Sequence, residues 1–489
     1  MIGRQDRWQE DLFVACSLRD LVPDDHILKR VDKVLDLSWL RDAVKECYCS
    51  DNGRPGIDPE VAVRLMLAGL FQGIVHDRKL LREAQVNLAM RWFIGYRLDE
   101  KLPDHSSLTR IRQRWGPARF KRIFERTVGQ CVSLGLVGGD ILHVDATLIR
   151  ADVSWESLVA RHADEVVSAN GDTSSVAKDD SDESHPVKSK KKSKKKSKCK
   201  KVSRTDPDAT LTTSNKHSRM EPSFKQHTGV DDKCGVIVDA HVTTGEASEG
   251  QQLPDQIDRV EKLLNTEIDT VTADSGYAHG SNYGHLLRED ITQVIPPQRL
   301  SGGRRKTLPL IKFKYDAINE TVTCPAGRKM KSGKTSDKGT WYRGKARHCQ
   351  QCPLRDRCVP PSAKRRSVLI AKEYVALTRA RREHAQGWPE NKRDLYNRHR
   401  WLVEGVHGRA KTQHGLRRAA RRGLANVRIQ AYLTAAAMNL KRLAAALRFI
   451  LTLSTGPEAA HRPYSACSPN HSPIRPSAYA QTPNLRTAA

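Results

Sequence analysis

The pattern of apolar and polar residues predicts helices along the first part of the chain. Residues 1–138 carry apolar positions at helical spacing, as in GIDPEVAVRLMLAGLFQGI, where Asp58 occupies the N-cap position and Pro59 the first helical position. DRKLLREAQVNLAMRWFIGY and ARFKRIFERTVGQCVSLG predict two further helices, and a basic helix is expected to begin near Ser106 or Ser107. Short basic helices joined by tight turns suit the DNA major groove, and they suit an ordinary helical bundle equally well.

The pattern changes to strands after the glycine pair that ends this region. DILHVDATLI is a short, apolar, strand-like run, and similar runs return in FKQHTGVDDKCGVIVDAHVTT and DTVTADSG. PDQIDRVEKLLN between them has helical spacing, so residues 139–298 predict a mixture of strands and helices. Within this region, residues of about 165–205 form a low-complexity insert rich in Ser, Asp and Lys, which we expect to be disordered.

The remainder of the chain divides into three stretches. Residues 299–375 are basic and loop-rich and carry a cluster of cysteines, residues 376–452 return to helical spacing, and residues 453–489 form a proline-containing tail expected to be disordered. The predicted fold class is α+β and multidomain: a helical N-terminal domain, a mixed α/β core in two parts, and a small Cys-rich insertion between those parts.

Composition favours a cytoplasmic globular protein. Of 489 residues, 38% are hydrophobic and 29% are charged, no apolar run is long enough to cross a bilayer, and the N-terminal residues have no signal-peptide core. We therefore expect no membrane partner.

The net charge points to a polyanionic partner. The formal charge is +28, and removing the ten lysines between Lys188 and Lys201 still leaves +18, so the excess belongs to the whole chain. A solvated surface or attraction to anionic lipid would be the alternatives. No amphipathic anchor or lipidation signal is present, so nucleic acid is the favoured partner.

Four of the eleven cysteines form a cluster. Cys324 is followed by Cys349, Cys352 and Cys358, which gives a Cys-x2-Cys pair flanked by single cysteines. Four thiolates suit a tetrahedral structural zinc ion, and a short loop-rich segment needs such a staple. Packing of four reduced cysteines in a small core is the alternative.

Two carboxylates lie at strand-like runs, and a third lies on a predicted helix. Asp145 lies within LHVDAT, Asp274 ends TVTADSGY, and Glu404 is the one carboxylate between Arg398 and Arg428, a stretch with nine Lys or Arg. Each acid alone has an ordinary structural explanation: a turn cap, a turn residue or an ion pair.

Together, the three acids suit phosphodiester chemistry. Carboxylates on neighbouring strands can share a divalent ion, and Mg²⁺ prefers hard oxygen ligands. On the helix, Tyr396, Arg400, Glu404, His407 and Lys411 form a continuous stripe, so the bases beside Glu404 could hold a phosphate.

Four segments make the chain resemble the insertion-sequence transposases of the DDE type, in the IS5/IS1182-like group with an InsH-type N-terminal domain. The first runs from GRPGIDPEVAV to LTRIRQR. The others are HVDATLIRADVS, then FKQHTGVDDKCGVIVDAHVTTG with TADSGYAHGSNY, then YNRHRWLVEGVHGRAKTQHGLRRAARRG. Together they cover most of residues 15–450.

The resemblance implies roles for individual residues. The catalytic, metal-binding Asp, Asp and Glu of the family fall on Asp145, Asp274 and Glu404, which would hold Mg²⁺ or Mn²⁺. The step from Tyr396 to Arg400 is one residue longer than in related families. The residues expected to contact DNA are Tyr396, Arg400, Lys411, Arg417, Arg418, Arg421 and Arg422.

The resemblance also implies a fold and an activity. The catalytic domain would be RNase H-like, and the 130 positions from Asp274 to Glu404 leave room for an insertion, which the cysteine segment fills. The helical region 1–138 would bind DNA. The protein would be a DNA transposase that binds terminal inverted repeats, cleaves DNA and transfers strands, as a homodimer or larger synaptic complex at the bacterial nucleoid.

Two other functions use the same residues. An RNase H-like nuclease without strand transfer would need the same three carboxylates, and a catalytically decayed copy would retain DNA binding alone. Sequence barely separates the first from a transposase, whereas the intact Asp145, Asp274 and Glu404 speak against the second.

Overall fold

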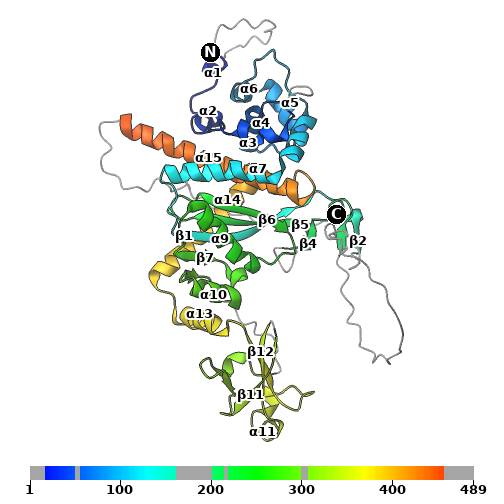
Figure 1. The fold of residues 1–489 in the computed structure, drawn as a ribbon, viewed down its shortest axis with the longest axis vertical. Helices are drawn as coiled ribbons and strands as arrows, with labels where there is room; N and C mark the ends of the chain where they lie inside the picture. The colour runs from blue at the N-terminus through cyan, green and yellow to red at the C-terminus, as the bar shows by residue number, and fades with distance from the viewer. Residues whose placement is uncertain are drawn as a thin grey trace, which may run out of the picture.

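Seven helices form the N-terminal part of the described chain (Figure 1). The computed structural model describes residues 17–49, 56–160, 201–213, 219–298, 307–336 and 338–455. The helices are α1 (Leu18–Leu21), α2 (Ile27–Asp32), α3 (Leu40–Val44), α4 (Pro59–Phe71), α5 (Asp77–Val86), α6 (Leu88–Ile94) and α7 (His105–Ser133).

The N-terminal helices follow the sequence pattern with two differences. Asp58 caps α4 as predicted, because its side chain accepts the backbone N–H of Glu60. The single helix predicted through DRKLLREAQVNLAMRWFIGY is wrong: Asn87 interrupts it, and its side chain caps α6 by accepting the N–H of Met90. The basic helix begins at His105 and continues through a kink at Gly116, where φ is +65°, into the next predicted helix.

The central sheet joins strands that lie far apart in the sequence. Its core order is β6 (Ile237–Thr244), β5 (Glu221–Asp231), β1 (Ile141–Arg150), β7 (Thr270–Ala273) and β8 (Thr292–Val294). β5 is antiparallel to both β6 and β1, whereas β7 and β8 run parallel to β1. This is the mixed sheet expected of an RNase H-like core.

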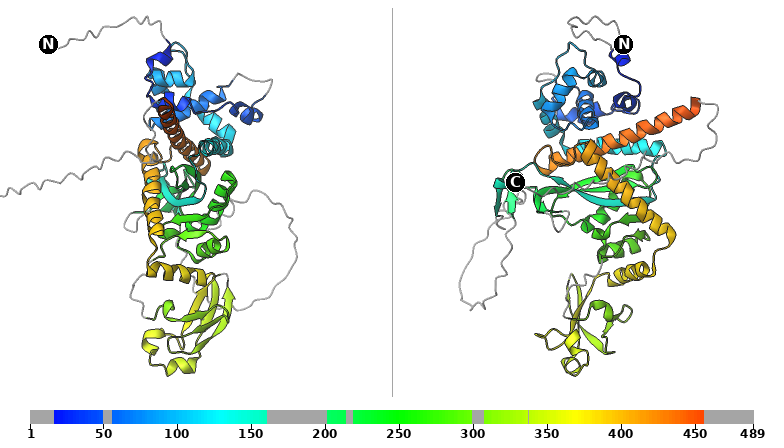
Figure 2. Two further views of the ribbon diagram at one scale, coloured as in Figure 1. Left: turned by 90° about the vertical axis from the view of Figure 1, so that its left-hand side faces the viewer. Right: turned by 180° about the vertical axis from the view of Figure 1, so that it is seen from behind.

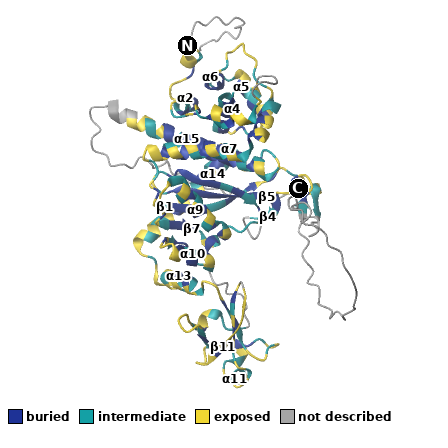
Figure 3. Ribbon diagram, in the orientation of Figure 1, coloured by how far each residue is buried: buried dark blue, intermediate teal, exposed yellow. Residues whose placement is uncertain are grey.

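Helices cover the sheet on both faces (Figure 2). They are α9 (Leu253–Leu264), α10 (Gly280–Arg288), α14 (Glu390–Gln413) and α15 (Leu424–Thr455), while α13 (Tyr374–Gln386) packs on α10. α14 packs on β1 and β7, and α15 packs on β6 and along α7. One continuous hydrophobic core therefore joins the N-terminal helices, the sheet and α15, with the buried positions concentrated along this middle layer (Figure 3).

Three short strands, which lie between β1 and β5 in the sequence, extend the sheet beyond the start of β5. They are β2 (Leu158–Ala160), β3 (Lys201–Ser203) and β4 (Thr210–Thr212), and β4 pairs with the beginning of β5. The insert predicted to be disordered, about 165–205, lies outside the described residues except at its end, where β3 forms. The predicted disordered tail is likewise outside them from residue 456, since α15 extends to Thr455.

A second sheet carries the cysteines. Its order is β13 (Ser367–Ala371), β12 (Gly339–Arg343), β11 (Lys329–Ser336), β10 (Thr321–Thr323) and β9 (Lys314–Asp316). Its small core is separate from the main one and includes Phe313, Tyr342 and Cys358. In the part of the chain that the structure describes, no helix is long and apolar enough to cross a membrane.

Candidate active site

Asp145 lies on the central strand of the sheet. It is level with Thr228 of β5, its Oδ1 accepts the backbone N–H of Ala146 at 2.7 Å, and its Oδ2 lies 3.6 Å from Nδ1 of His407. Burial pushes the pKa of Asp145 upward, but His407 and the Ala146 N–H outweigh it, so the pKa lies below its ordinary value. The side chain is therefore a carboxylate at neutral pH.

Asp274 lies beside Asp145 at the end of the neighbouring strand. Val144 of β1 is in register with Ala273 of β7, so the two aspartates come next at equivalent positions, with a spacing of about 5 Å from strand to strand. Asp274 also caps a short 3₁₀ turn by accepting the N–H of Gly276. Burial raises the pKa of Asp274, and the nearby negative charge of Asp145 raises it further. The two carboxylates thus repel each other, and a bound cation would relieve this repulsion.

Glu404 lies on α14, and two histidines of that helix attach it to the sheet. Nδ1 of His399 is hydrogen-bonded to Oγ1 of Thr272 at 3.0 Å, and Nε2 of His407 to Oγ1 of Thr228 at 3.0 Å. Both histidines are buried, while Glu404 is exposed. Glu404 is three residues from His407, about 60° around the helix axis, so it lies beside the face that packs on the sheet.

The charges of all three predicted acids act on Tyr396 of α14. Its ring stacks on His399, with 5.9 Å between ring centroids. Burial raises the pKa of Tyr396, and the charges of Asp274, Asp145 and Glu404 raise it further, against the opposing charge of Arg400. Tyr396 is therefore within electrostatic range of all three carboxylates.

Two side chains without a predicted role, Glu249 and Tyr277, also lie at the carboxylates. Glu249 contributes to the raised pKa of Asp274, and its Oε1 pairs with Nζ of Lys225 at 3.0 Å. Tyr277 is fully buried, and its hydroxyl has no hydrogen-bond partner among the described residues. Burial raises the pKa of Tyr277 most, and the charges of Asp145, Glu249 and Asp274 raise it further. Tyr277 follows Asp274 closely in the sequence, but no sequence signal marks Glu249.

The predicted DNA-contacting side chains fall into two groups. Arg400, Arg417, Arg418 and Arg422 are exposed, and Lys411 is half-buried. Burial lowers the pKa of Lys411, while the charge of Asp145 opposes this, so Lys411 lies near the candidate site.

Arg421 differs from the exposed arginines. Its guanidinium pairs with the buried Asp77 at 2.6 Å, so this side chain has a structural partner within the chain. Its predicted contact with DNA stays a prediction.

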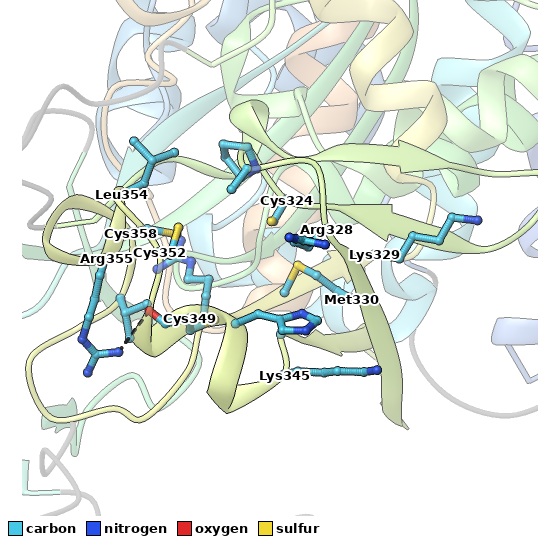
Figure 4. Close-up of a pocket in the computed structure, with 16 residues that line it drawn as sticks. Cys324, Arg328, Lys329, Met330, Lys345, Cys349, Cys352, Leu354, Arg355 and Cys358 are labelled. Carbon is cyan, nitrogen blue, oxygen red and sulfur yellow. Dashed lines mark hydrogen bonds between the residues drawn. The ribbon is translucent and has the colours of Figure 1, made fainter.

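The four clustered cysteines line one small cavity (Figure 4). Cys324, Cys349, Cys352 and Cys358 are all free thiols around a cavity of about 40 Å³, which is large enough for a water-sized occupant. Cys324, Cys349 and Cys358 also pack in the small hydrophobic core, so the alternative of a reduced cysteine core has its own support.

Metal binding must be judged from the chemistry of the donors. Among the described residues, no group of three or more His, Cys, Asp or Glu side chains is gathered tightly enough to hold a metal ion. Asp145 and Asp274 nevertheless supply paired hard oxygens with unrelieved repulsion, which fits Mg²⁺ or Mn²⁺. The four thiols fit Zn²⁺ by ligand type.

The contact between His407 and Asp145 predicts an effect on rate. His407→Ala removes the side chain that orients Asp145 and anchors α14 to Thr228. Loss of such an orienting partner typically lowers activity by about 10–100-fold. The rate of single-turnover DNA cleavage measures this loss, with DNA affinity determined in parallel. Gln413→Ala is the control, because Gln413 is exposed on the same helix. Equal rates for the two variants would contradict the role given to His407.

Comparisons with known proteins identify two regions of the chain. A family model described as a transposase domain (DUF772) matches residues 16–114, and one described as a transposase DDE domain matches residues 323–444. No curated protein matches the chain.

Among solved structures, the chain is similar to a "Mos1 transposase paired-end complex with left transposon end". The identity is 10%, over 54% of this chain and 67% of that chain, with a TM-score of 0.16. A TM-score this low carries no structural argument, so the assignment depends on the family models. The first covers the N-terminal helices as far as α7, and the second covers the cysteines and Glu404. The two family matches together support an insertion-sequence transposase of the DDE type.

Proposed function

We propose that the chain binds the terminal inverted repeats of its insertion sequence, cleaves DNA at the element ends and transfers the cleaved strands to target DNA. The observation that supports this most is the position of Asp145 and Asp274 on adjacent parallel strands, with Glu404 on the helix that covers them. The helices of region 1–138 would help to recognise the repeats. DNA transposase function itself follows from the two family matches.

The proposed reaction has two phosphoryl-transfer steps. Water attacks the phosphorus at the element end, the bond from phosphorus to the 3′ oxygen breaks, and a 3′-OH is released. That 3′-OH then attacks a target phosphodiester, forms a new bond to phosphorus and displaces the target 3′ oxygen. No covalent protein intermediate is needed.

The chain's own residues would hold the reacting groups. Asp145, Asp274 and Glu404 would bind Mg²⁺ or Mn²⁺, which when bound supplies activation of the attacking oxygen and stabilisation of the leaving oxygen. Lys411, near Asp145, would hold the reacting phosphate. The side chains proposed for further DNA contacts are Tyr396, Arg400, Arg417, Arg418, Arg421 and Arg422.

Two element ends must be brought together, so we propose a homodimer or larger synaptic complex that acts on nucleoid DNA in the bacterial cytoplasm. Light scattering of the protein with and without end DNA measures the number of chains. A complex that contains one chain and one DNA end throughout the reaction would contradict this assembly.

Strand transfer separates a transposase from a nuclease. The test uses labelled DNA from the boundaries of the gene's element, with Mg²⁺ and a target plasmid. A labelled end joined to the plasmid supports the proposal. Cleavage without joining would indicate a nuclease, and binding without cleavage would indicate a decayed copy.

We also propose that Cys324, Cys349, Cys352 and Cys358 hold a structural zinc ion. Purified protein is then expected to contain about one zinc per chain. The double variant Cys349→Ser/Cys352→Ser should lose it and should become sensitive to protease within residues 307–371, because a small core needs the staple. Elemental analysis and limited proteolysis measure both effects, with Cys47→Ala as the control. Zinc-free protein with an equally protease-resistant second sheet would contradict the site.

A further inference from the structure

The edge of the sheet where β4 pairs with the start of β5 forms a groove with the end of α14. One wall comes from β4, the start of β5 and the end of β1, and the other comes from α14 and the loop after it. The cavity between them has a volume of about 750 Å³. Its side chains include Leu148, Thr212, Ser223 and Thr412.

The lining of this groove is strongly basic. Arg150, Arg219, Lys411 and Arg417 contribute four cationic groups from separate segments. Among the described residues that line it, Glu221 is the single acid, and it pairs with Arg150 at 2.8 Å. The groove therefore carries an excess of positive charge, which a bound polyanion would neutralise.

The backbone holds the cations of the two walls together. The N–H of Arg150 donates to the carbonyl of Arg417 at 3.3 Å, and the N–H of Ala419 donates to the carbonyl of Arg150 at 2.8 Å. These bonds form a bridge between the end of β1 and the loop that follows α14. The positions of Arg150 and Arg417 are thus set by main-chain contacts, even though both side chains are exposed.

Aromatic stacking orients the fourth cation. The Arg219 guanidinium lies 3.8 Å from the ring centroid of Trp155, which begins the short 3₁₀ turn that leads into β2. Trp155 is 41% exposed, so the pair stands at the surface. Stacking on an indole ring orients a guanidinium while leaving its N–H edge available to an anion.

Lys411 connects the groove to the candidate active site. Burial lowers the pKa of its ammonium group, and the charges of Arg150 and Arg417 lower it further, whereas Asp145 opposes them. Lys411 is therefore within range both of the groove's arginines and of Asp145. Leu148, which lines the groove, is three positions after Asp145 on β1, so the groove and the candidate site share this strand.

We propose that this groove binds the sugar–phosphate backbone of the DNA strand beside the cleaved phosphate, with Arg150, Arg219, Lys411 and Arg417 each neutralising a phosphate. This rests on the proposed function, because it places the substrate of the same site. The contact would be independent of sequence, since phosphates carry no base information. The wall formed by β4, the start of β5 and the end of β1 would then hold the DNA against α14.

Salt-dependent DNA binding tests the groove without any cleavage. The probe is a fluorescein-labelled duplex of arbitrary sequence, and anisotropy gives Kd at salt concentrations from about 50 to 200 mM. Losing two phosphate contacts should lower the slope of log K against log salt by about 1.8 in magnitude. Arg150→Gln/Arg219→Gln is therefore expected to show this reduction, together with an affinity loss of roughly tenfold or more.

Matched variants exclude a general effect of charge. Lys331→Gln/Lys334→Gln removes two exposed cations from β11 of the second sheet and should leave the slope unchanged. Arg417→Gln changes one exposed side chain and should lower the slope by about 0.9, which gives a second measurement if the double variant folds poorly.

The outcomes separate this proposal from the function on which it rests. Equal slopes for the groove variants, the β11 variant and the wild type would overturn the groove, even if the wild type cleaves element ends. Lower slopes confined to the groove variants support it, even if the wild type fails to cleave.

Discussion

Replacing Glu404 by glutamine is expected to lower the rate of DNA cleavage by about a thousandfold or more while leaving DNA affinity nearly unchanged. A metal ion at a phosphoryl-transfer site stabilises several kcal/mol of developing charge, which corresponds to about three powers of ten in rate. Glutamine keeps the size of the side chain and removes the charge that the proposed ion needs. Glu404 is exposed on α14, so the substitution should not disturb the fold.

The measurement is single-turnover cleavage of labelled end DNA, with affinity determined in parallel. Glu390→Gln supplies the matched control, because Glu390 is also exposed and lies in the first turn of the same helix. It should cleave at the wild-type rate. Cleavage by the Glu404 variant at a comparable rate would remove Glu404 from the proposed site.

Replacing Asp77 by alanine is expected to destabilise the protein more than any surface substitution. Asp77 begins α5 and pairs with Arg112 of α7 through two hydrogen bonds of 2.8 Å and with Arg421 at 2.6 Å. Arg112 is 5% exposed, so removing the carboxylate leaves at least one buried guanidinium without its partner. Breaking a buried ion pair from one side typically costs about 3–5 kcal/mol.

Thermal unfolding followed by tryptophan fluorescence measures this effect, and we expect the midpoint to fall by about 10 °C. Asp99→Ala is the control, because Asp99 forms an exposed pair with Arg97, and such pairs contribute about 0–1 kcal/mol. Midpoints that agree between the two variants would show that the buried network contributes little.

The ion pair of Asp77 also predicts a dependence on pH. Burial pushes the pKa of Asp77 upward, but Arg112 and Arg421 outweigh burial and hold it below its ordinary value. A carboxyl whose folded-state pKa is depressed contributes full stability above its unfolded value of about 3.9 and loses that contribution as the pH falls through the folded-state pKa. The difference between wild type and Asp77→Ala should therefore shrink in acid.

Local sequence signals predicted the elements where one residue decides the conformation. Asp58 and Pro59 marked the start of α4, and the apolar run around Asp145 marked β1, because capping chemistry and strand patterning depend on neighbours in the chain. The helix cap at Asn87 was not predicted, although it too depends on neighbouring residues. Its side chain competes for backbone N–H groups, and this local competition ended one helix and began another within an unbroken apolar pattern.

Features that depend on distant contacts could not be predicted in this way. The strands β2, β3 and β4 are each three residues long and carry no periodic signal, so only the pairing of β4 with β5 reveals that β4 lines the groove. The partnership of Asp77 with Arg421 spans 344 positions. A basic cluster therefore predicted a DNA contact for Arg421, while its partner in the fold lay too far away in sequence to be recognised.

At the candidate site, too, the sequence indicated individual residues but not the contacts that depend on the fold. The family resemblance placed Asp145, Asp274 and Glu404, and the parallel register of β1 and β7 brings the two aspartates together. His407 was placed on the helical stripe without a role, because its contact with Asp145 depends on how α14 lies across the sheet. Glu249 was not singled out at all, since a lone glutamate before a helix has no distinguishing pattern.

Metal rescue of an Asp145→Cys variant tests the central claim most directly, because it separates metal ligation from a structural role. Mg²⁺ requires hard oxygen ligands, whereas Mn²⁺ tolerates a sulfur ligand better. The measurement is the rate of end cleavage by wild type and variant in each ion. We predict that the variant is inactive with Mg²⁺ and regains cleavage with Mn²⁺. Cleavage by the variant in Mg²⁺ at the wild-type rate would show that Asp145 holds no catalytic metal.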